Sequence, residues 1–347
     1  MNAVMKFSGL ARSVLGHDAL ARTPARSSSP STVFKPRHQI SAELIPRNRD
    51  DATIEVSGRT VILRDLRSPI WRNPTISKGD LLRYYVRIAP VILPHLRDRA
   101  VVLRRYPDGF QGASVTMQSA PGSLPEWVAL CSIQTPANRI VDFVMIHDVP
   151  SLLWTINLGC IDLHQWHAPC DAVDRPDALM FALDPGAGAP FAQVCETALI
   201  VREALAAVGL VAYVKTSGTG GLHLRAPIAR GPTQRQIWRL AKEMASSLAG
   251  VHNDLMTVER RLGMPAARRV LVDYEQNSWR HLFVTPYSVR PRPHATVSAP
   301  LTWGEVERGC RGDDFRIDTL PHRIKKVGDP WEPLLNRRNR FRLDKLL

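Results

Sequence analysis

The chain has 347 residues, of which 44% are hydrophobic and 22% are charged. This is an ordinary composition for a globular protein with a substantial core. No apolar run approaches the ~18 residues of a membrane-spanning helix, so the sequence predicts no membrane partner. Five cysteines are scattered without a Cys-x-x-Cys pair, which favours a reducing compartment and argues against a disulfide framework.

The net charge of +14 is concentrated at the two ends of the chain. Residues 1–50 and residues 323–347 each contain eight Lys or Arg residues and three acidic ones. Basic ends around a nearly balanced body favour a partner with many phosphates. Solubility combined with an unstructured basic arm is an equally open explanation.

The composition divides the chain into three parts. Residues 1–51 are predicted to be a disordered basic arm, because residues 22–31 are rich in Ser, Pro and Arg and poor in large apolar side chains. An organelle transit peptide is an alternative for the first 30 residues. Residues 52–335 form the predicted domain. Residues 336–347 are a basic tail, either solvated or in contact with nucleic acid through the arginines around Phe341.

Helix and strand patterns alternate along the body. An apolar stripe predicts a helix at 78–95, followed by strands at 101–103, 140–146 and 178–184. A helix runs from Pro190 to its closing Gly209, strands follow at 211–214 and 222–224, and Thr233 caps a second long helix. Late strands are predicted at 270–273 and 282–284. The interleaving predicts a mixed α/β or α+β fold.

Three segments carry residues suited to phosphoryl transfer. This chemistry uses divalent ions held by carboxylates, most simply two at i and i+2 on one strand and a third on a neighbouring strand. An apolar strand at 178–184 ends in Asp184-Pro185-Gly186, a glycine loop at 215–223 ends in His223, and a strand at 270–273 ends in Asp273.

These segments resemble the polymerase domain of bacterial ligase D, a member of the archaeo-eukaryotic primase superfamily. Further matches occur in the family's order, at residues 77–80, 105–109, 163–166, 286–290 and 327–331. Together they cover about residues 60–335. The resemblance implies an α+β fold in which a primase-like core with an RRM-like sheet packs on a smaller N-terminal α/β module.

The resemblance also implies a site for a nucleotide with Mn²⁺ or Mg²⁺. The implied metal ligands are Asp184 and Asp273, the nucleotide contacts are His164, Ser217, His223 and Arg290, and Lys78 holds a DNA 5′-phosphate. Planar guanidinium groups suit phosphate oxygens. The implied partners are DNA ends or gapped DNA and nucleoside triphosphates, with a separate ATP-dependent DNA ligase and a Ku-type protein. The implied location is the bacterial cytoplasm, at the nucleoid.

The sequence departs from the family pattern at positions that the family uses to bind metal, phosphate and template. Ala182 replaces the first metal-binding aspartate, and Gly220 replaces a phosphate-binding lysine. The paired aromatic residues that stack at the template fall at Val115-Thr116-Met117, and a basic residue near the 5′-phosphate falls at Ser68. Each change removes a ligand, a charge or a stacking surface.

Two hypotheses concern replacement ligands. Glu275 lies two residues after Asp273, so in an extended strand both would face one side and Glu275 would supply the missing catalytic carboxylate. A solvent-exposed acid at a strand end is the alternative. Separately, Cys160, His164, His167 and Cys170 are four zinc-type ligands within eleven residues. Buried cysteines and a surface histidine are the alternative there.

The sequence therefore predicts a ligase D polymerase-like protein of double-strand-break repair by non-homologous end joining. We expect it to bind DNA ends and nucleotide, with template-directed nucleotidyl transfer impaired or lost. An active primase-polymerase using Asp184, Asp273 and Glu275 is one alternative. A non-catalytic scaffold is the other.

Overall fold

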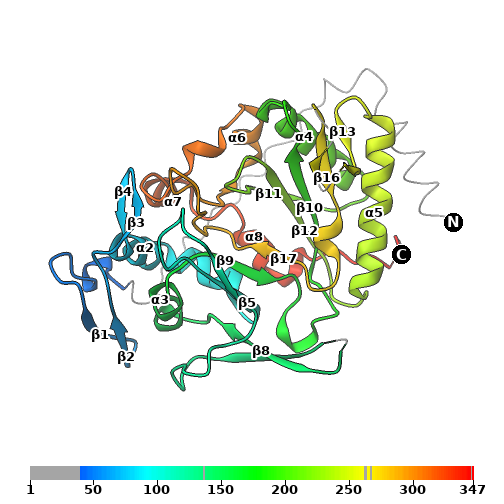
Figure 1. Ribbon diagram of the computed structural model, residues 1–347. Helices are drawn as coiled ribbons and strands as arrows, with labels where there is room; N and C mark the ends of the chain where they lie inside the picture. Colours follow the sequence, from blue (N-terminus) through cyan, green and yellow to red (C-terminus); the bar gives the residue numbers. More distant parts are fainter. Residues whose placement is uncertain (1–39, 136, 262–263, 266–267, 345) are drawn as a thin grey trace.

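Two six-stranded sheets form the framework of the protein (Figure 1). This computed structural model describes residues 40–347, apart from 136, 262–263, 266–267 and 345. Both sheets contribute to one continuous apolar core, and the predicted mixed α+β fold is confirmed. No helix in the described part of the chain is both long and apolar enough to span a bilayer.

The first sheet has the strand order β13-β16-β10-β12-β11-β18, and only the β13–β16 pair is parallel. Its strands are β10 (Ala178–Pro185), β11 (Tyr213–Thr216), β12 (Leu222–Pro227), β13 (Met256–Thr257), β16 (Val270–Asp273) and β18 (Pro300–Leu301). The first six residues of β10 are all buried, as expected for a central strand covered on both faces.

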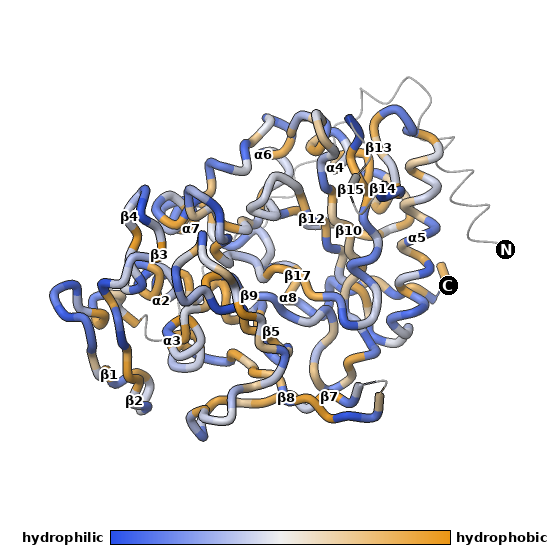
Figure 2. The backbone as a smooth tube through the Cα atoms, in the orientation of Figure 1, coloured by the Kyte–Doolittle hydropathy of each residue, from blue (hydrophilic) through white to orange (hydrophobic). Residues whose placement is uncertain are grey.

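Two long helices pack on this sheet. Helix α4 (Phe191–Ala207) contacts β10, β12 and β16, while α5 (Gln234–Val251) contacts β10, β13 and β16. Thr233 and Gln236 form a capping box at the start of α5, which satisfies backbone N–H groups that the first helical turn leaves free. Helix α5 alternates between polar and apolar segments (Figure 2), as an amphipathic helix does.

The second sheet has the order β17-β9-β5-β8-β7, with β6 paired to β5. Its strands are β5 (Ala100–Arg105), β6 (Val115–Met117), β7 (Leu130–Gln134), β8 (Ile140–Met145), β9 (Cys160–Trp166) and β17 (Leu282–Val284). Helices α2 (Lys78–Leu96) and α3 (Val149–Asn157) pack against each other beside it. Two buried tyrosines hold α2 to other segments of the protein. Tyr84 donates to Tyr287 O, and Tyr85 donates to Ile161 O of β9, each at 2.7 Å.

The smaller elements surround these layers. They are β1 (Ala52–Val56), β2 (Arg59–Leu63), β3 (Pro69–Arg72), β4 (Thr75–Ser77), β14 (Arg260–Arg261), β15 (Met264–Pro265), α6 (Trp303–Glu307), α7 (Leu320–Val327) and α8 (Glu332–Leu335). The three predicted helices and most predicted strands are confirmed. The strand predicted at 211–214 lies two residues later, as β11.

The predicted boundaries at the two ends differ from the described structure. Most of the arm predicted for residues 1–51 lies outside the described residues, but residues 40–51 belong to the folded body. Ile45 is 1% exposed, and Arg83 donates to its carbonyl oxygen. In the predicted tail, the backbone of Phe341 bonds with Pro227 and Ala229 at the end of β12. The tail therefore follows the sheet, and its Phe341 ring lies against Gly209.

Candidate functional site

A row of side chains crosses the first sheet. The register pairs Asp273 on β16 with Ala182 on β10, Ala182 with His223 on β12, and His223 with Lys215 on β11. Directly paired residues of antiparallel strands face the same side of a sheet. Asp184 lies two residues beyond Ala182 and therefore faces that side as well. The two predicted metal-binding aspartates thus occupy neighbouring strands, with Ala182 directly opposite one of them.

The two aspartates differ in their surroundings. Burial and the charge of Asp273 raise the pKa of Asp184. Asp273 is 3% exposed, and its carboxylate accepts hydrogen bonds from Arg260 Nη2 at 2.9 Å, Gln276 Nε2 at 3.0 Å and the backbone N–H of Glu275 at 2.9 Å. The charge of Asp273 is therefore already balanced by the guanidinium of Arg260.

These residues do not fit a pair of divalent ions. The methyl group of Ala182 offers no oxygen where Asp273 needs a partner carboxylate, and the Asp273 oxygens are already engaged by three donors. Nowhere in the described ranges do three or more His, Cys, Asp or Glu side chains form a metal-binding group. A two-metal site needs oxygen ligands for ions about 3.5–4 Å apart.

The hypothesis that Glu275 replaces the missing carboxylate rested on an extended strand, and that premise is wrong. Strand β16 ends at Asp273, Tyr274 adopts right-handed helical angles, and Glu275 begins a short 3₁₀ helix. Because the backbone turns at Tyr274, residues 273 and 275 no longer share a face. The Glu275 carboxylate instead accepts a hydrogen bond from Trp238 Nε1 of α5 at 3.0 Å.

A glycine loop that contains Ser217 packs against β10 beside Asp184. Ser217 Oγ accepts the backbone N–H groups of Thr219 and Gly221 at 3.1 and 2.9 Å, which closes the loop. A Cβ atom at Gly221 would lie 2.4 Å from Leu183 O and 3.1 Å from Asp184 Oδ1. Only glycine allows this close approach to β10.

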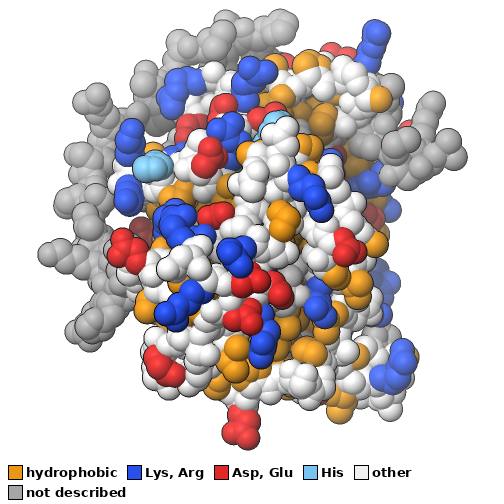
Figure 3. Space-filling model, turned by 60° about the vertical axis from the view of Figure 1, so that its left-hand side comes forward, with side chains coloured by type: hydrophobic (Ala, Val, Ile, Leu, Met, Phe, Trp, Pro, Cys, Tyr) orange, Lys and Arg blue, Asp and Glu red, His pale blue; other side chains and the backbone are white. Residues whose placement is uncertain are grey.

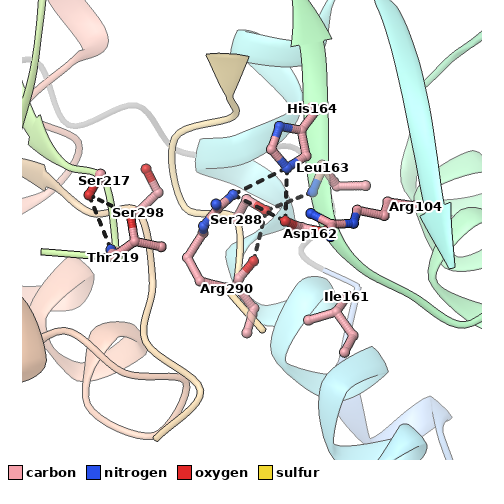
Figure 4. Close-up of polar contacts among 12 residues, drawn as sticks. Arg104, Ile161, Asp162, Leu163, His164, Ser217, Thr219, Ser288, Arg290 and Ser298 are labelled. Carbon is pink, nitrogen blue, oxygen red and sulfur yellow. Dashed lines mark hydrogen bonds and ion pairs between the residues drawn. The ribbon is translucent and has the colours of Figure 1, made fainter. Parts of the chain in front are cut away.

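The same loop lies against Arg290. Gly218 has φ +71°, and a Cβ atom there would meet Arg290 Cγ at 2.5 Å. Arg290 Nη1 donates to Asp162 Oδ2 at 3.1 Å, and Asp162 Oδ2 also lies 2.8 Å from His164 Nε2 (Figure 4). Burial alone would raise the pKa of the fully buried Asp162, but His164 and Arg290 hold it below its ordinary value.

Asp162 is a functional candidate that the sequence analysis missed. Its carboxylate orients both His164 and Arg290, so it fixes two predicted nucleotide contacts from one position. The signal was present, because Asp162 lies two residues before His164 and residues i and i+2 of a strand share a face. Figure 4 shows His164 and Arg290 around Asp162, with Ser217 of the glycine loop on the other side of Arg290.

Lys215 and His223 form the other end of the row. The Lys215 side chain is fully buried, and its Nζ lies 2.9 Å from His223 Nδ1 and 2.5 Å from Ser298 Oγ. Burial, reinforced by the charges of Arg290 and Arg225, lowers the pKa of Lys215 well below its ordinary value. The pKa of His223 is also well below its ordinary value, mainly because of burial and then because of Lys215.

Comparisons with known proteins identify the family. The family described as "LigD, primase-polymerase domain" matches residues 77–331. The chain belongs to this family. It is 31% identical over 261 residues to the "Multifunctional non-homologous end joining protein LigD" of Mycolicibacterium smegmatis, covering 74% of this chain and 34% of that protein. A protein of the same name from Pseudomonas aeruginosa is 30% identical over 272 residues, covering 76% and 32%.

A solved structure supports the same assignment. The "Polymerase Domain from Mycobacterium tuberculosis Ligase D in complex with DNA" matches with a TM-score of 0.74 and 29% identity, covering 79% of this chain and 98% of that one. The chain spans about a third of the length of the LigD proteins named above. It is therefore similar to their polymerase part.

Two surface features that the family resemblance implies are missing at the positions where they are expected. Residue 220, where the family resemblance implies a lysine, is a glycine with φ +110°, and a Cβ atom there would have no neighbour within 4 Å. Strand β6 presents Val115, which is 52% exposed, and Thr116 where paired aromatic residues are implied. Neither place offers a positive charge or a stacking ring.

Lys78 lies apart from the row, at the first turn of α2. It is 8% exposed, its Nζ is 3.9 Å from Asp65 Oδ2, and its backbone N–H bonds to Ser68 O at 2.9 Å. Burial, with a contribution from Arg105, lowers the pKa of Lys78. The position predicted to have lost a basic residue, Ser68, thus lies beside Lys78.

The zinc hypothesis and the expectation of unpaired cysteines are both wrong. Cys170 forms a disulfide with Cys131 of β7, with Cα atoms 6.0 Å apart and a sequence separation of 39. Cys160 and His164 lie four residues apart on β9, about 13 Å in an extended strand, which no single zinc ion spans. His167 is buried and bonds to Ala178 O. The scattered spacing of the cysteines concealed the disulfide.

Proposed function

We propose that this LigD polymerase-type domain binds DNA ends and nucleotide but has impaired or lost nucleotidyl transfer. The observation that carries the proposal is the pairing of Ala182 with Asp273 across β10 and β16. One carboxylate is missing there, and the other forms a salt bridge with Arg260 at 2.9 Å. A phosphoryl-transfer site of the two-metal type depends on those oxygens.

Retained binding residues support the binding half of the proposal. His164, Ser217 and Arg290 converge on one glycine loop, and His223 lies in the row beside it. Arg290 donates through a planar fork suited to phosphate oxygens. On the face seen in Figure 3, Lys and Arg side chains are interspersed with acidic ones. DNA contact on that face would depend on individual basic side chains rather than on a continuous basic patch.

The names of the relatives support the proposed pathway and a DNA partner. The LigD relatives are named for non-homologous end joining, and the matched structure is a complex with DNA. We infer that this chain acts in the same repair process at the bacterial nucleoid. Its proposed partners are DNA ends or gaps, nucleoside triphosphates, a separate ATP-dependent DNA ligase and a Ku-type protein.

Primer extension on gapped, 5′-phosphorylated DNA with Mn²⁺ tests the catalytic half. The wild-type chain should incorporate little or nothing, and Ala182→Asp should raise the rate by at least about tenfold. Ala182→Asn is the matched control, because it has the same size without the charge and should not restore activity. Efficient extension by the wild-type chain would establish the alternative of an active primase-polymerase.

Binding to the same DNA tests the other half. Lys78→Gln should weaken the binding of 5′-phosphorylated gapped DNA, and the effect should disappear with a 5′-hydroxyl. Arg87→Gln, an exposed change on the same helix, is the matched control and should have little effect. A wild-type chain that binds neither DNA nor nucleotide is the result expected of a non-catalytic scaffold, and it would refute the proposal.

A further inference from the structure

The end of the row formed by Lys215 and His223 has no acidic partner. Lys215 Nζ contacts His223 and Ser298 and lies 5.9 Å from the centre of the Trp331 ring. Within the described part of the chain it forms no salt bridge with any carboxylate. Without a counter-charge a buried lysine is driven toward its neutral form, in agreement with its lowered pKa, and an anion bound nearby would favour the charged form. The residue that stands between Lys215–His223 and Asp273 in the row is Ala182, which is uncharged.

The hydrogen bonds of Lys215 fix the direction of a donor. Ser298 Oγ gives its proton to Thr216 O at 2.8 Å, so it accepts from Lys215. In its charged form Lys215 has no lone pair, so it also donates to His223 Nδ1 and leaves the ring proton of His223 on Nε2. Across the described residues, the side chain of His223 bonds only through Nδ1. Its Nε2–H therefore remains as a donor on the side of the sheet that carries Asp184.

The negative end of the row already has its cation. Arg260 Nη2 lies 2.9 Å from Asp273 Oδ2. An arginine held there supplies the positive charge that an incoming metal ion would bring. Compared with the family pattern, Ala182 removes one negative charge from the middle of the row. With Asp273 paired to Arg260, Asp184 is the one carboxylate of the row without a salt bridge among the described residues. The row therefore holds less negative charge than a pair of divalent ions needs.

We propose that this site binds a nucleoside triphosphate through its phosphates without a divalent cation, with His223, oriented by Lys215, and Arg290 as donors. The inference rests on the proposed function, since it concerns the nucleotide that the site is proposed to hold. Free ATP carries more negative charge than its metal complex. A site with one carboxylate fewer and a buried lysine accordingly suits free ATP.

Calorimetric titration with ATP, in EDTA and in MnCl₂, tests the proposal. The wild-type chain should bind ATP in EDTA at least as tightly as in MnCl₂. Ala182→Asp should weaken binding in EDTA by at least about tenfold, a loss that MnCl₂ should reverse, because the added carboxylate repels free ATP and attracts the metal. Ala182→Asn is again the uncharged control and should stay close to the wild-type chain.

Two further measurements isolate Lys215. Lys215→Met should weaken ATP binding in EDTA several-fold, whereas Lys242→Met, an exposed change on α5, should not. If Lys215→Met does not fold, ¹⁵N NMR of the wild-type chain with ATP in EDTA still reports the tautomer, and His223 must then carry its proton on Nε2. A proton on Nδ1, or ATP binding that needs Mn²⁺, would overturn the proposal.

The outcomes separate this inference from the proposed function. ATP binding that occurs only with Mn²⁺ refutes the metal-free site and leaves nucleotide binding intact. ATP binding in neither condition refutes the inference and the nucleotide part of the function. Binding of 5′-phosphorylated gapped DNA, measured on the same preparation, then shows whether the DNA-end part still holds.

Discussion

Replacing Asp177 by asparagine should be among the most destabilising single changes in the protein. The Asp177 carboxylate accepts hydrogen bonds from Arg99 at 2.7 Å, Arg225 at 3.0 Å and Arg340 at 3.2 Å. The side chains of Arg99 and Arg225 are 8% and 5% exposed, and that of Arg340 is 20% exposed. One carboxylate thus balances three guanidinium groups, of which two are buried.

The magnitude follows from what the change leaves behind. Breaking a buried ion pair by removing one partner costs about 3–5 kcal/mol, because the remaining charge stays buried. Asparagine keeps one acceptor oxygen but no charge, so we expect a loss of at least about 3 kcal/mol. For roughly 300 folded residues, this lowers the unfolding midpoint by about 5 °C. The change also frees Arg340, which holds the C-terminal segment to the body.

Urea unfolding at pH 7 measures the effect, and an exposed pair in the same region supplies the control. Asp171 accepts from Arg230 at 2.7 Å, but their side chains are 67% and 26% exposed. Asp171→Asn should therefore cost no more than about 1 kcal/mol. Equal losses for the two variants, or a loss below about 1 kcal/mol for Asp177→Asn, would refute the reasoning about burial.

Three other outcomes are expected. Because the pKa of Lys215 is lowered on folding, the unfolded chain binds more protons up to about pH 10.4, so stability should rise with pH in that window. Lys215→Met should flatten this rise in unfolding experiments, and an unchanged rise would assign it to His223, Arg290 or Arg225 instead. Glu275→Gln should leave ATP binding within about twofold of the wild type, since its carboxylate bonds to Trp238; a clear loss of Mn²⁺ affinity would restore the three-carboxylate hypothesis. Thiol titration of the unfolded chain without reductant should find the three cysteines outside the Cys131–Cys170 disulfide, and titration of all five would contradict that bond.

The central elements of the fold were predictable because their local patterns agree with their packing. The apolar run of β10 reads as a strand covered on both faces, and the Thr233 cap marks the start of α5. Short, half-exposed strands were missed, although β7 alternates exposed and buried residues around Cys131 and Ile133. Five residues with only two buried apolar positions give a weak strand signal.

The family resemblance supplied Asp184 and Asp273, which the structure places on the neighbouring strands β10 and β16. The i, i+2 rule that suggested Glu275 failed because the backbone turns at Tyr274. Nothing local shows that Lys215 lies beside Ser298, which is 83 residues away. The Cys131–Cys170 disulfide is likewise a contact between separate segments. The charge balance of the row therefore could not be predicted from the sequence and is seen only in the folded structure.

The contact between Trp238 and Glu275 gives the protein an internal optical probe. The indole N–H bonds to the Glu275 carboxylate, and the backbone N–H of the same glutamate bonds to Asp273. Indole emission responds to the charge and hydration around it, so a rearrangement at Asp273 is expected to change the fluorescence of Trp238. Comparison with a Trp238→Phe variant would isolate that signal and follow occupancy of the row without any label.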